Sequence, residues 1–209
     1  DLFAITAGAD PATTMQGAIG AQVTNVAMLS GAGARYILVP TVPDLGATPG
    51  FRAQGPVASA TGTQLAVTYN NGLFSTLASQ GLRVIPLDTF NLVREVIADP
   101  GAYGVTNVTG TACQPQITSN SLTCNPGTYV TPDAASTYLF ADGVHPTGAT
   151  HAILAQYAES ILEAPRQIAL LPYTESLTGK LRAEQVSSHV AGKPQQDGMA
   201  WWGNVRGDN

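Results

Sequence analysis

Apolar side chains recur at helical spacing along four stretches of the chain, and each stretch predicts a helix. The first lies within residues 15–30 and ends at Gly31-Ala-Gly33. The second is the most regular, with Gly81 at the expected C-cap and apolar residues at four-residue steps, namely Leu65, Tyr69, Leu73 and Leu77. A short helix over residues 89–98 and a longer one over residues 150–162 complete the set.

Two short apolar runs lie between these helices and predict strands. They are Tyr36–Val39 and Leu82–Leu87, and a long helical segment separates them. Because strands so far apart cannot form a hairpin, we expect parallel pairing through right-handed crossovers, which is the α/β class. Ligands of such sheets bind beyond the carboxyl ends of the strands, where the loop of residues 42–49 follows the first run.

Composition narrows the range of partners and locations. Only 11 % of the 209 residues are charged, well below the quarter that is typical, and the net charge is −5. So few charges suit an extracytoplasmic bacterial protein better than a cytosolic one. The acidic balance and the lack of a Lys/Arg cluster argue against nucleic acid as a partner. No apolar run approaches the roughly 20 residues that a membrane-spanning helix needs.

Cys113 and Cys124 are the only cysteines, and they lie in a loop-rich, polar insertion over residues 101–137. Without an accompanying Cys/His cluster they do not resemble the ligand set of a zinc site. Two alternatives remain, a pair of free thiols or a disulfide that closes a small loop. The disulfide is favoured, because the loop has few other means of ordering, and it would stabilise the fold by about 3 kcal/mol.

The segment Phe140-Ala-Asp142-Gly-Val-His145-Pro146-Thr147 carries the strongest chemical signal. An imidazole acts as a general base at neutral pH when another group fixes its tautomer and stabilises the imidazolium. Asp142 precedes His145 by three residues on a turn with Gly143 and Pro146, so its carboxylate can accept the Nδ1–H hydrogen bond. Nε2 would then face a nucleophile. An Asp-x-x-His spacing alone is more often a surface turn, so both interpretations stay open on this motif.

Other segments extend the pattern, which resembles the SGNH (GDSL) hydrolase family over residues 1–164. Asp142-Gly-Val-His145-Pro matches the family's C-terminal Asp-x-x-His block, and the loop Val42-Pro-Asp-Leu-Gly46 looks like the segment that follows its Gly-x-Asn-Asp block. Residues 90–107 are similar to the same region of autotransporter-type members. The resemblance implies a doubly wound (flavodoxin-like) parallel sheet, of which this chain holds only the later strands and helices.

The same resemblance implies a chemistry. It is the hydrolysis of carboxylic esters, of an acyl ester or a lipid, through a serine acyl-enzyme. His145 would be the catalytic base and Asp142 its orienting carboxylate, and neither a metal nor an organic cofactor would be needed. Two other interpretations remain, a non-catalytic secreted passenger or binding module on the same scaffold, and a carbohydrate acetyl esterase.

The chain also departs from the family pattern. The blocks Gly-Asp-Ser and Gly-x-Asn-Asp do not occur in it, and Asp1 stands where the last Asp of the Gly-x-Asn-Asp block would be. We therefore expect the nucleophilic serine and the oxyanion-hole Gly and Asn in an N-terminal part of the same domain, upstream of this sequence. That part would also be needed for folding. Residues 1–209 alone should be inactive.

The end of the chain differs in character from the rest. We expect the C-terminal part of the hydrolase domain over residues 1–164 and a helical linker over residues 165–209. Trp201 and Trp202 would suit the aromatic girdle at the start of an outer-membrane β-barrel, which would attach the protein to the surface of a Gram-negative bacterium. A partly ordered linker is the alternative for these residues.

Two further polar residues receive structural interpretations, and a third receives none. Asp44 belongs to the turn Pro-Asp-Leu-Gly, where such residues shape the backbone. His151 follows His145 by six residues and is expected on the surface or in the packing of the last helix, and His189 has no chemical context.

Overall fold

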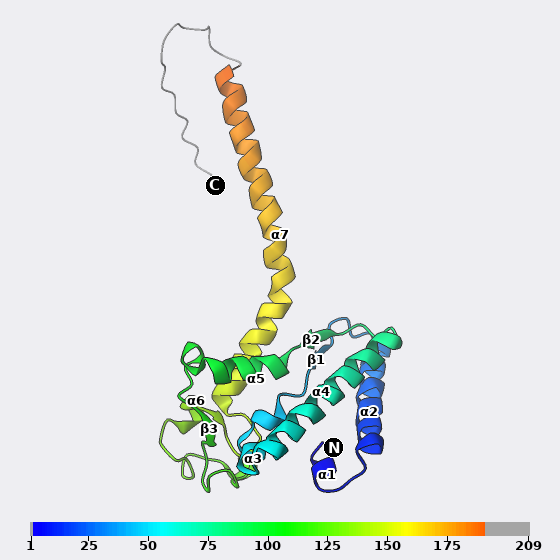
Figure 1. Cartoon of the computed structure of the whole chain (residues 1–209). Helices are drawn as coiled ribbons and strands as arrows, with labels where there is room; N and C mark the ends of the chain where they lie inside the picture. Colours follow the sequence, from blue (N-terminus) through cyan, green and yellow to red (C-terminus); the bar gives the residue numbers. More distant parts are fainter. Residues whose placement is uncertain (1, 191–209) are drawn as a thin grey trace. The chain divides into compact units, whose positions relative to one another are not determined.

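The computed structural model describes residues 2–190, the last three of them by their backbone alone. The expectations for Asp1, for the side chain of His189, and for Trp201 and Trp202 lie outside the described residues. Figure 1 shows the elements in chain order. They are α1 (Leu2–Thr6), α2 (Pro11–Gly31), β1 (Leu38–Pro40), η1 (Leu45–Ala47), α3 (Pro49–Ala53), α4 (Pro56–Ser79), β2 (Ile85–Leu87), α5 (Thr89–Ala98), η2 (Pro100–Tyr103), β3 (Asn107–Thr111), η3 (Ser121–Thr123), α6 (Ala134–Thr137), β4 (Tyr138–Phe140) and α7 (Gly148–Val190).

The chain divides into two compact units, residues 1–158 and 159–209. Helix α7 runs from the first into the second and contains Pro165 and Pro172, whereas the sequence predicts a helix over residues 150–162 and a helical linker that begins at residue 165. Each proline removes one backbone hydrogen-bond donor, and the helix continues through both positions. None of the helices within the described residues has the length and apolar character to cross a bilayer.

Short sequence signals set the ends of the helices in the first unit. Asp10 caps α2 by accepting the N–H of Thr13 at 2.8 Å, and Asp88 caps α5 by accepting the N–H of Asn91 at 3.0 Å. Helix α4 begins at a proline, which suits the first helical position, and Gly81 follows its end with φ of +68°. The predicted helices over residues 15–30, 65–77 and 89–98 are therefore present.

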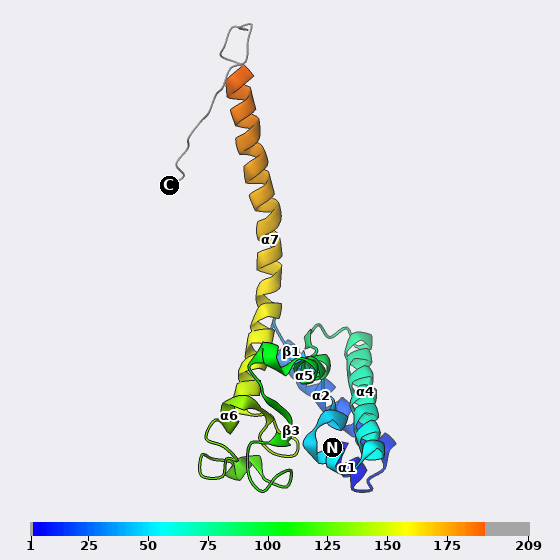
Figure 2. The same cartoon turned by 60° about the vertical axis from the view of Figure 1, so that its left-hand side comes forward.

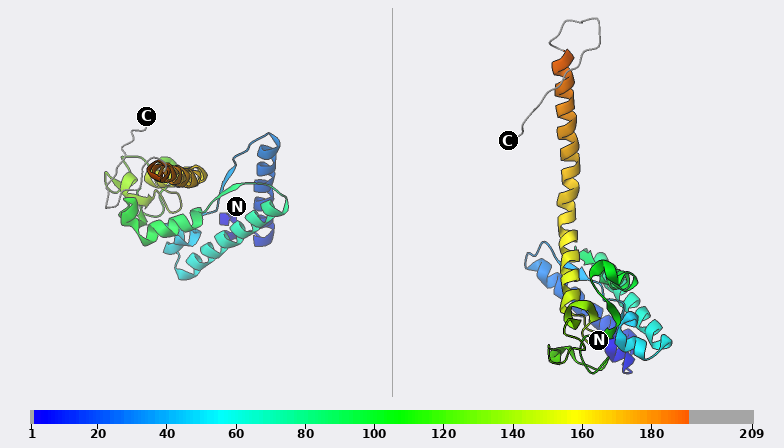
Figure 3. Two further views of the ribbon diagram at one scale, coloured as in Figure 1. Left: turned by 90° about the horizontal axis from the view of Figure 1, so that it is seen from above. Right: turned by 90° about the vertical axis from the view of Figure 1, so that its left-hand side faces the viewer.

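Strands β1 and β2 pair in parallel, with Leu38 opposite Ile85 and Pro40 opposite Leu87. Apolar side chains of α2, α4, β1 and the residue before β1 form one buried cluster beside this pair, made of Val23, Val26, Ile37, Val39, Leu73 and Leu77. Figure 3 shows α4 running from α3 towards α2, both of which it contacts. The parallel α/β pairing predicted from the sequence is confirmed, although each strand has only three residues.

A second parallel pair corrects the sequence interpretation of residues 101–137 as loop. Strand β3 pairs with β4, so the described residues contain two separate two-stranded sheets. Figure 2 shows the remaining loops of this segment gathered around β3 and α6. The sequence does not predict β3, because the five residues of this strand contain no apolar run. Its last residue, Thr111, exchanges two backbone hydrogen bonds with the side-chain amide of Gln116.

Candidate active site

Asp142 and His145 lie on the turn between β4 and α7, and the structure brings their side chains together. Nδ1 of His145 lies 2.8 Å from Oδ2 and 3.0 Å from Oδ1 of Asp142. Oδ1 also accepts the backbone N–H groups of Val144 and His145, at 2.9 and 2.7 Å. The carboxylate thus shapes its own turn and holds the imidazole ring. The aspartate side chain is 7 % exposed and that of the histidine 64 %.

Electrostatics fix the direction of this hydrogen bond. Burial by itself would raise the pKa of Asp142, but the N–H donors of His145, Val144 and Ser121 and the imidazole ring together lower that pKa from 3.8 to about 2. The carboxylate is therefore ionised at neutral pH and can only accept. Nδ1 must carry the proton, so Nε2 of the neutral ring is left with a lone pair to accept another.

The turn is held by backbone contacts from two directions. The N–H of Gly50, in α3, donates to the carbonyl of Gly143 at 2.8 Å. On the other side, a Cβ built on Gly143 would stand 2.6 Å from the carbonyl oxygen of Ile117. No side chain fits there without movement of the backbone. Position 143 therefore requires glycine, because the backbone of Ile117 approaches it so closely.

A cavity of about 320 Å³ opens beside His145. Its wall includes Pro40 and Thr41 at the carboxyl end of β1 and Phe140 at the carboxyl end of β4. Apolar side chains of α5 and α7 supply much of the rest, among them Leu92, Val93, Val96, Ile153 and Leu154. The exposed imidazole therefore stands at the edge of an apolar cavity at the carboxyl ends of parallel strands, where the sequence predicts a ligand site.

Known proteins share much of this sequence. The chain is 41 % identical over 159 residues to the Esterase EstA of Pseudomonas aeruginosa, an alignment that covers 73 % of this chain and 23 % of that protein. It is 36 % identical over 95 residues to Lipase 1 of Photorhabdus luminescens, covering 46 % of this chain and 14 % of the lipase. A GDSL esterase/lipase of Arabidopsis thaliana is 31 % identical over 132 residues, covering 59 % and 36 %.

These relatives and the Asp-x-x-His turn decide the family. The chain belongs to the SGNH (GDSL) hydrolase family. No protein-family model matches the chain. The chain spans about a quarter of the length of the EstA relatives and about a third of that of the plant GDSL relative. The mixed fold with small parallel sheets is consistent with a GDSL-type α/β protein.

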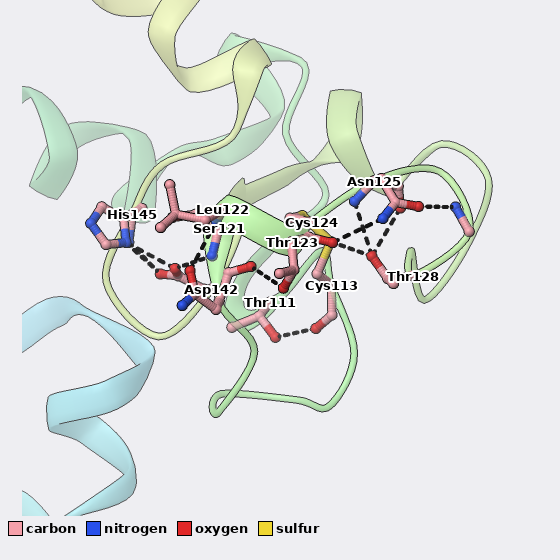
Figure 4. The surroundings of a disulfide bond; sticks show 12 residues. Thr111, Cys113, Ser121, Leu122, Thr123, Cys124, Asn125, Thr128, Asp142 and His145 are labelled. Atoms are coloured by element: carbon pink, nitrogen blue, oxygen red, sulfur yellow. Dashed lines mark hydrogen bonds and ion pairs between the residues drawn. A yellow bond between two sulfur atoms is a disulfide. The ribbon is translucent and has the colours of Figure 1, made fainter.

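This GDSL chain has its two cysteines joined in a disulfide, with Cα atoms 5.6 Å apart. The alternative of two free thiols is therefore not the state that the structure holds. Figure 4 shows the disulfide near Asp142 and His145. The bond closes a loop that reaches the carboxylate of Asp142. The contact is made by the backbone N–H of Ser121, which donates to Oδ2 at 2.7 Å.

Sequence reasoning missed Ser121, and no local signal could have found it. Its contribution is a backbone group, and the contact joins residues 21 positions apart. Its place depends on how the disulfide loop folds back towards β4. Only a prediction of the path of that loop would have revealed the contact.

The structural interpretations of Asp44 and His151 hold with one addition. Asp44 is buried, caps η1 by accepting the N–H of Gly46, and accepts a hydrogen bond from Thr63 at 2.6 Å. His151 lies in α7, where its Nδ1 donates to the carbonyl of Thr147 at 2.9 Å. It also lines the cavity beside His145. It does not pair with a carboxylate within the described residues.

Gly143→Ala tests the close packing of the turn. The added methyl group meets a backbone carbonyl, so the turn must shift, and we expect a loss of about 1–3 kcal/mol in the free energy of unfolding. Urea denaturation measures this loss. Gly148→Ala is the matched control, because no atom lies within 4 Å of its Cβ position at the start of α7. Equal stability of the two variants would contradict the proposed constraint.

The low pKa of Asp142 predicts a pH dependence of stability. Since the folded-state pKa lies below the ordinary value of 3.8, the carboxylate stabilises the fold above that pH and ceases to do so as the pH falls through about 2. The contribution is about 2 kcal/mol. Urea denaturation between pH 5 and pH 2 should show this loss in the wild type and not in Asp142→Asn. Parallel curves for the two proteins would refute the prediction.

Proposed function

We propose that this chain supplies the acid–base pair of a carboxylic ester hydrolase. His145 takes the proton from a serine hydroxyl as the serine attacks the ester carbonyl, and returns it to the leaving alcohol. It then activates water in the same way to release the acid from the acyl-enzyme. Asp142 keeps the proton on Nδ1 and stabilises the imidazolium that forms in each step.

The observation that carries the proposal is the geometry of the pair. An ionised, buried carboxylate holds Nδ1, and Nε2 remains open at the edge of a cavity. The names of the relatives, esterase and lipase, support the reaction class. The apolar lining of the cavity supports an ester with an acyl chain over an acetylated sugar.

The nucleophile and the oxyanion donors complete this proposal. Gly-Asp-Ser is absent from the 209 residues, and the alignment to EstA covers only part of that protein. We place the serine, and the glycine and asparagine that would meet the oxyanion, in a part of the domain outside these residues. That part would add the strands that make the two small sheets into a doubly wound sheet.

The proposed location is outside the cytoplasm of a Gram-negative bacterium, secreted or at the cell surface. The disulfide supports an oxidising compartment, and the EstA relatives come from Pseudomonas. Acyl esters or lipids are the proposed substrates there.

Hydrolysis by the complete protein tests the proposal. The protein should release p-nitrophenol from acyl esters, and faster than it releases acetate from acetylated sugars. Labelling by an organophosphonate should identify the serine. The reverse preference would favour the carbohydrate acetyl esterase. No turnover and no labelling would refute the enzyme and favour a binding module.

A further inference from the structure

The disulfide loop offers a hydrogen bond that neither the family motif nor the mechanism above uses. Oδ2 of Asp142 has two donors on opposite sides, Nδ1 of His145 at 2.8 Å and the N–H of Ser121 at 2.7 Å. In Figure 4 the carboxylate lies between the imidazole ring and the backbone of Ser121. The oxygen that orients the ring is therefore itself held by a second hydrogen bond, from the N–H of Ser121.

The loop that carries Ser121 has little hydrophobic packing of its own. Leu122, the next residue, is 91 % exposed, and the segment is otherwise mostly polar. The loop is instead tied down covalently. Cys124 closes the short helix η3 that begins at Ser121, and its disulfide partner Cys113 is 1 % exposed.

The buried end of the disulfide is anchored directly beside the pair. The N–H of Cys113 donates to the carbonyl of Ala141, the residue before Asp142, at 3.1 Å. One step earlier, the N–H of Ala112 donates to the carbonyl of Phe140 at 2.8 Å. The path from Asp142 through Ala141, Cys113 and Cys124 to Ser121 therefore closes a short ring of contacts around the carboxylate.

We infer that the Cys113–Cys124 loop is a positioning element of the active site, which presents the N–H of Ser121 to Oδ2 of Asp142 and so fixes the carboxylate that orients His145. The inference rests on the proposed function of the pair. Its consequence is that the disulfide acts on catalysis as well as on stability. Without the N–H the carboxylate loses one of its restraints, and the imidazole is held in the reactive orientation for less of the time.

Ser121→Pro removes this one donor and leaves the disulfide in place. Proline suits the position, because Ser121 is the first residue of η3 and the preceding Asn120 is extended, with φ of −120° and ψ of 125°. Ser121→Ala is the matched control, since it changes the side chain and keeps the N–H. In the complete protein we expect kcat to fall about 10-fold in Ser121→Pro, with KM unchanged, and to stay unchanged in Ser121→Ala.

A second readout does not depend on activity. The ¹³Cγ signal of Asp142 should titrate at a higher pH in Ser121→Pro than in the wild type, because a hydrogen bond to the charged form has been lost. Ser121→Ala should titrate as the wild type does. If both variants match the wild type in kcat and in this titration, the inference is overturned.

The role of the disulfide is tested by a cycle of variants. Replacing both Cys113 and Cys124 by alanine should lower kcat to a similar extent, and adding Ser121→Pro should lower it no further, since both changes remove the same restraint. Additive losses would show that the disulfide acts by another route and would overturn that part of the inference. A wild-type protein without esterase activity would refute the proposed function, while the titration of Asp142 would still decide the positioning.

Discussion

Replacing His145 by alanine in the complete protein should lower kcat by roughly 10⁴-fold or more, because the members of a catalytic triad act as a unit. Without the imidazole no group accepts the proton of the attacking hydroxyl. The side chain of His145 is 64 % exposed, so its removal leaves no cavity in the core. The fold should therefore persist, and circular dichroism and the unfolding midpoint serve to check it.

His151→Ala is the control for this experiment. His151 lines the same cavity, but its Nδ1 is bound to the carbonyl of Thr147 within its own helix and no carboxylate holds its ring. Its removal should change kcat by less than about 10-fold, since it forms no part of the proton transfer. If His151→Ala were the more damaging change, the roles assigned to the two histidines would have to be exchanged.

Asp142→Asn should lower kcat by less than His145→Ala does, since the imidazole remains.

The sequence was most informative where the interaction is local. Asp142 and His145 are three residues apart on a turn whose shape the carboxylate itself stabilises, so the pairing of their side chains follows from the motif. The same holds for the helix ends at Asp10 and Asp88, where the cap and its partner are three residues apart. In each case a few residues contain both members of the contact.

The sequence was uninformative where a contact joins distant segments. The N–H of Ser121 reaches Asp142 only because the disulfide loop folds back, and the carbonyl of Gly143 accepts the N–H of Gly50, which lies in α3. The sequence does not predict strand β3, for a related reason. Its partner β4 lies beyond the insertion, and the side chain of Gln116 takes backbone hydrogen bonds at the end of the strand. Backbone groups carry these contacts, and the identity of a side chain says little about them.

The 209-residue chain by itself should show no esterase turnover. No hydroxyl within residues 2–190 forms a hydrogen bond with Nε2 of His145, and the Gly-Asp-Ser nucleophile block is absent from the sequence. Ser121 comes near the pair, but its backbone binds Asp142, and in Figure 4 the open side of the imidazole points away from it. A base without a nucleophile and without oxyanion donors has no acyl-enzyme to form.

Complementation makes this last prediction decisive. The chain should give no p-nitrophenol above background and no organophosphonate label, and addition of the proposed N-terminal part of the domain should restore both. The label should then lie on the added part, and His145→Ala in this chain should abolish the restored activity. Turnover by residues 1–209 alone would place the nucleophile among the serines present here. The assignment of the nucleophile from the family pattern would then be wrong.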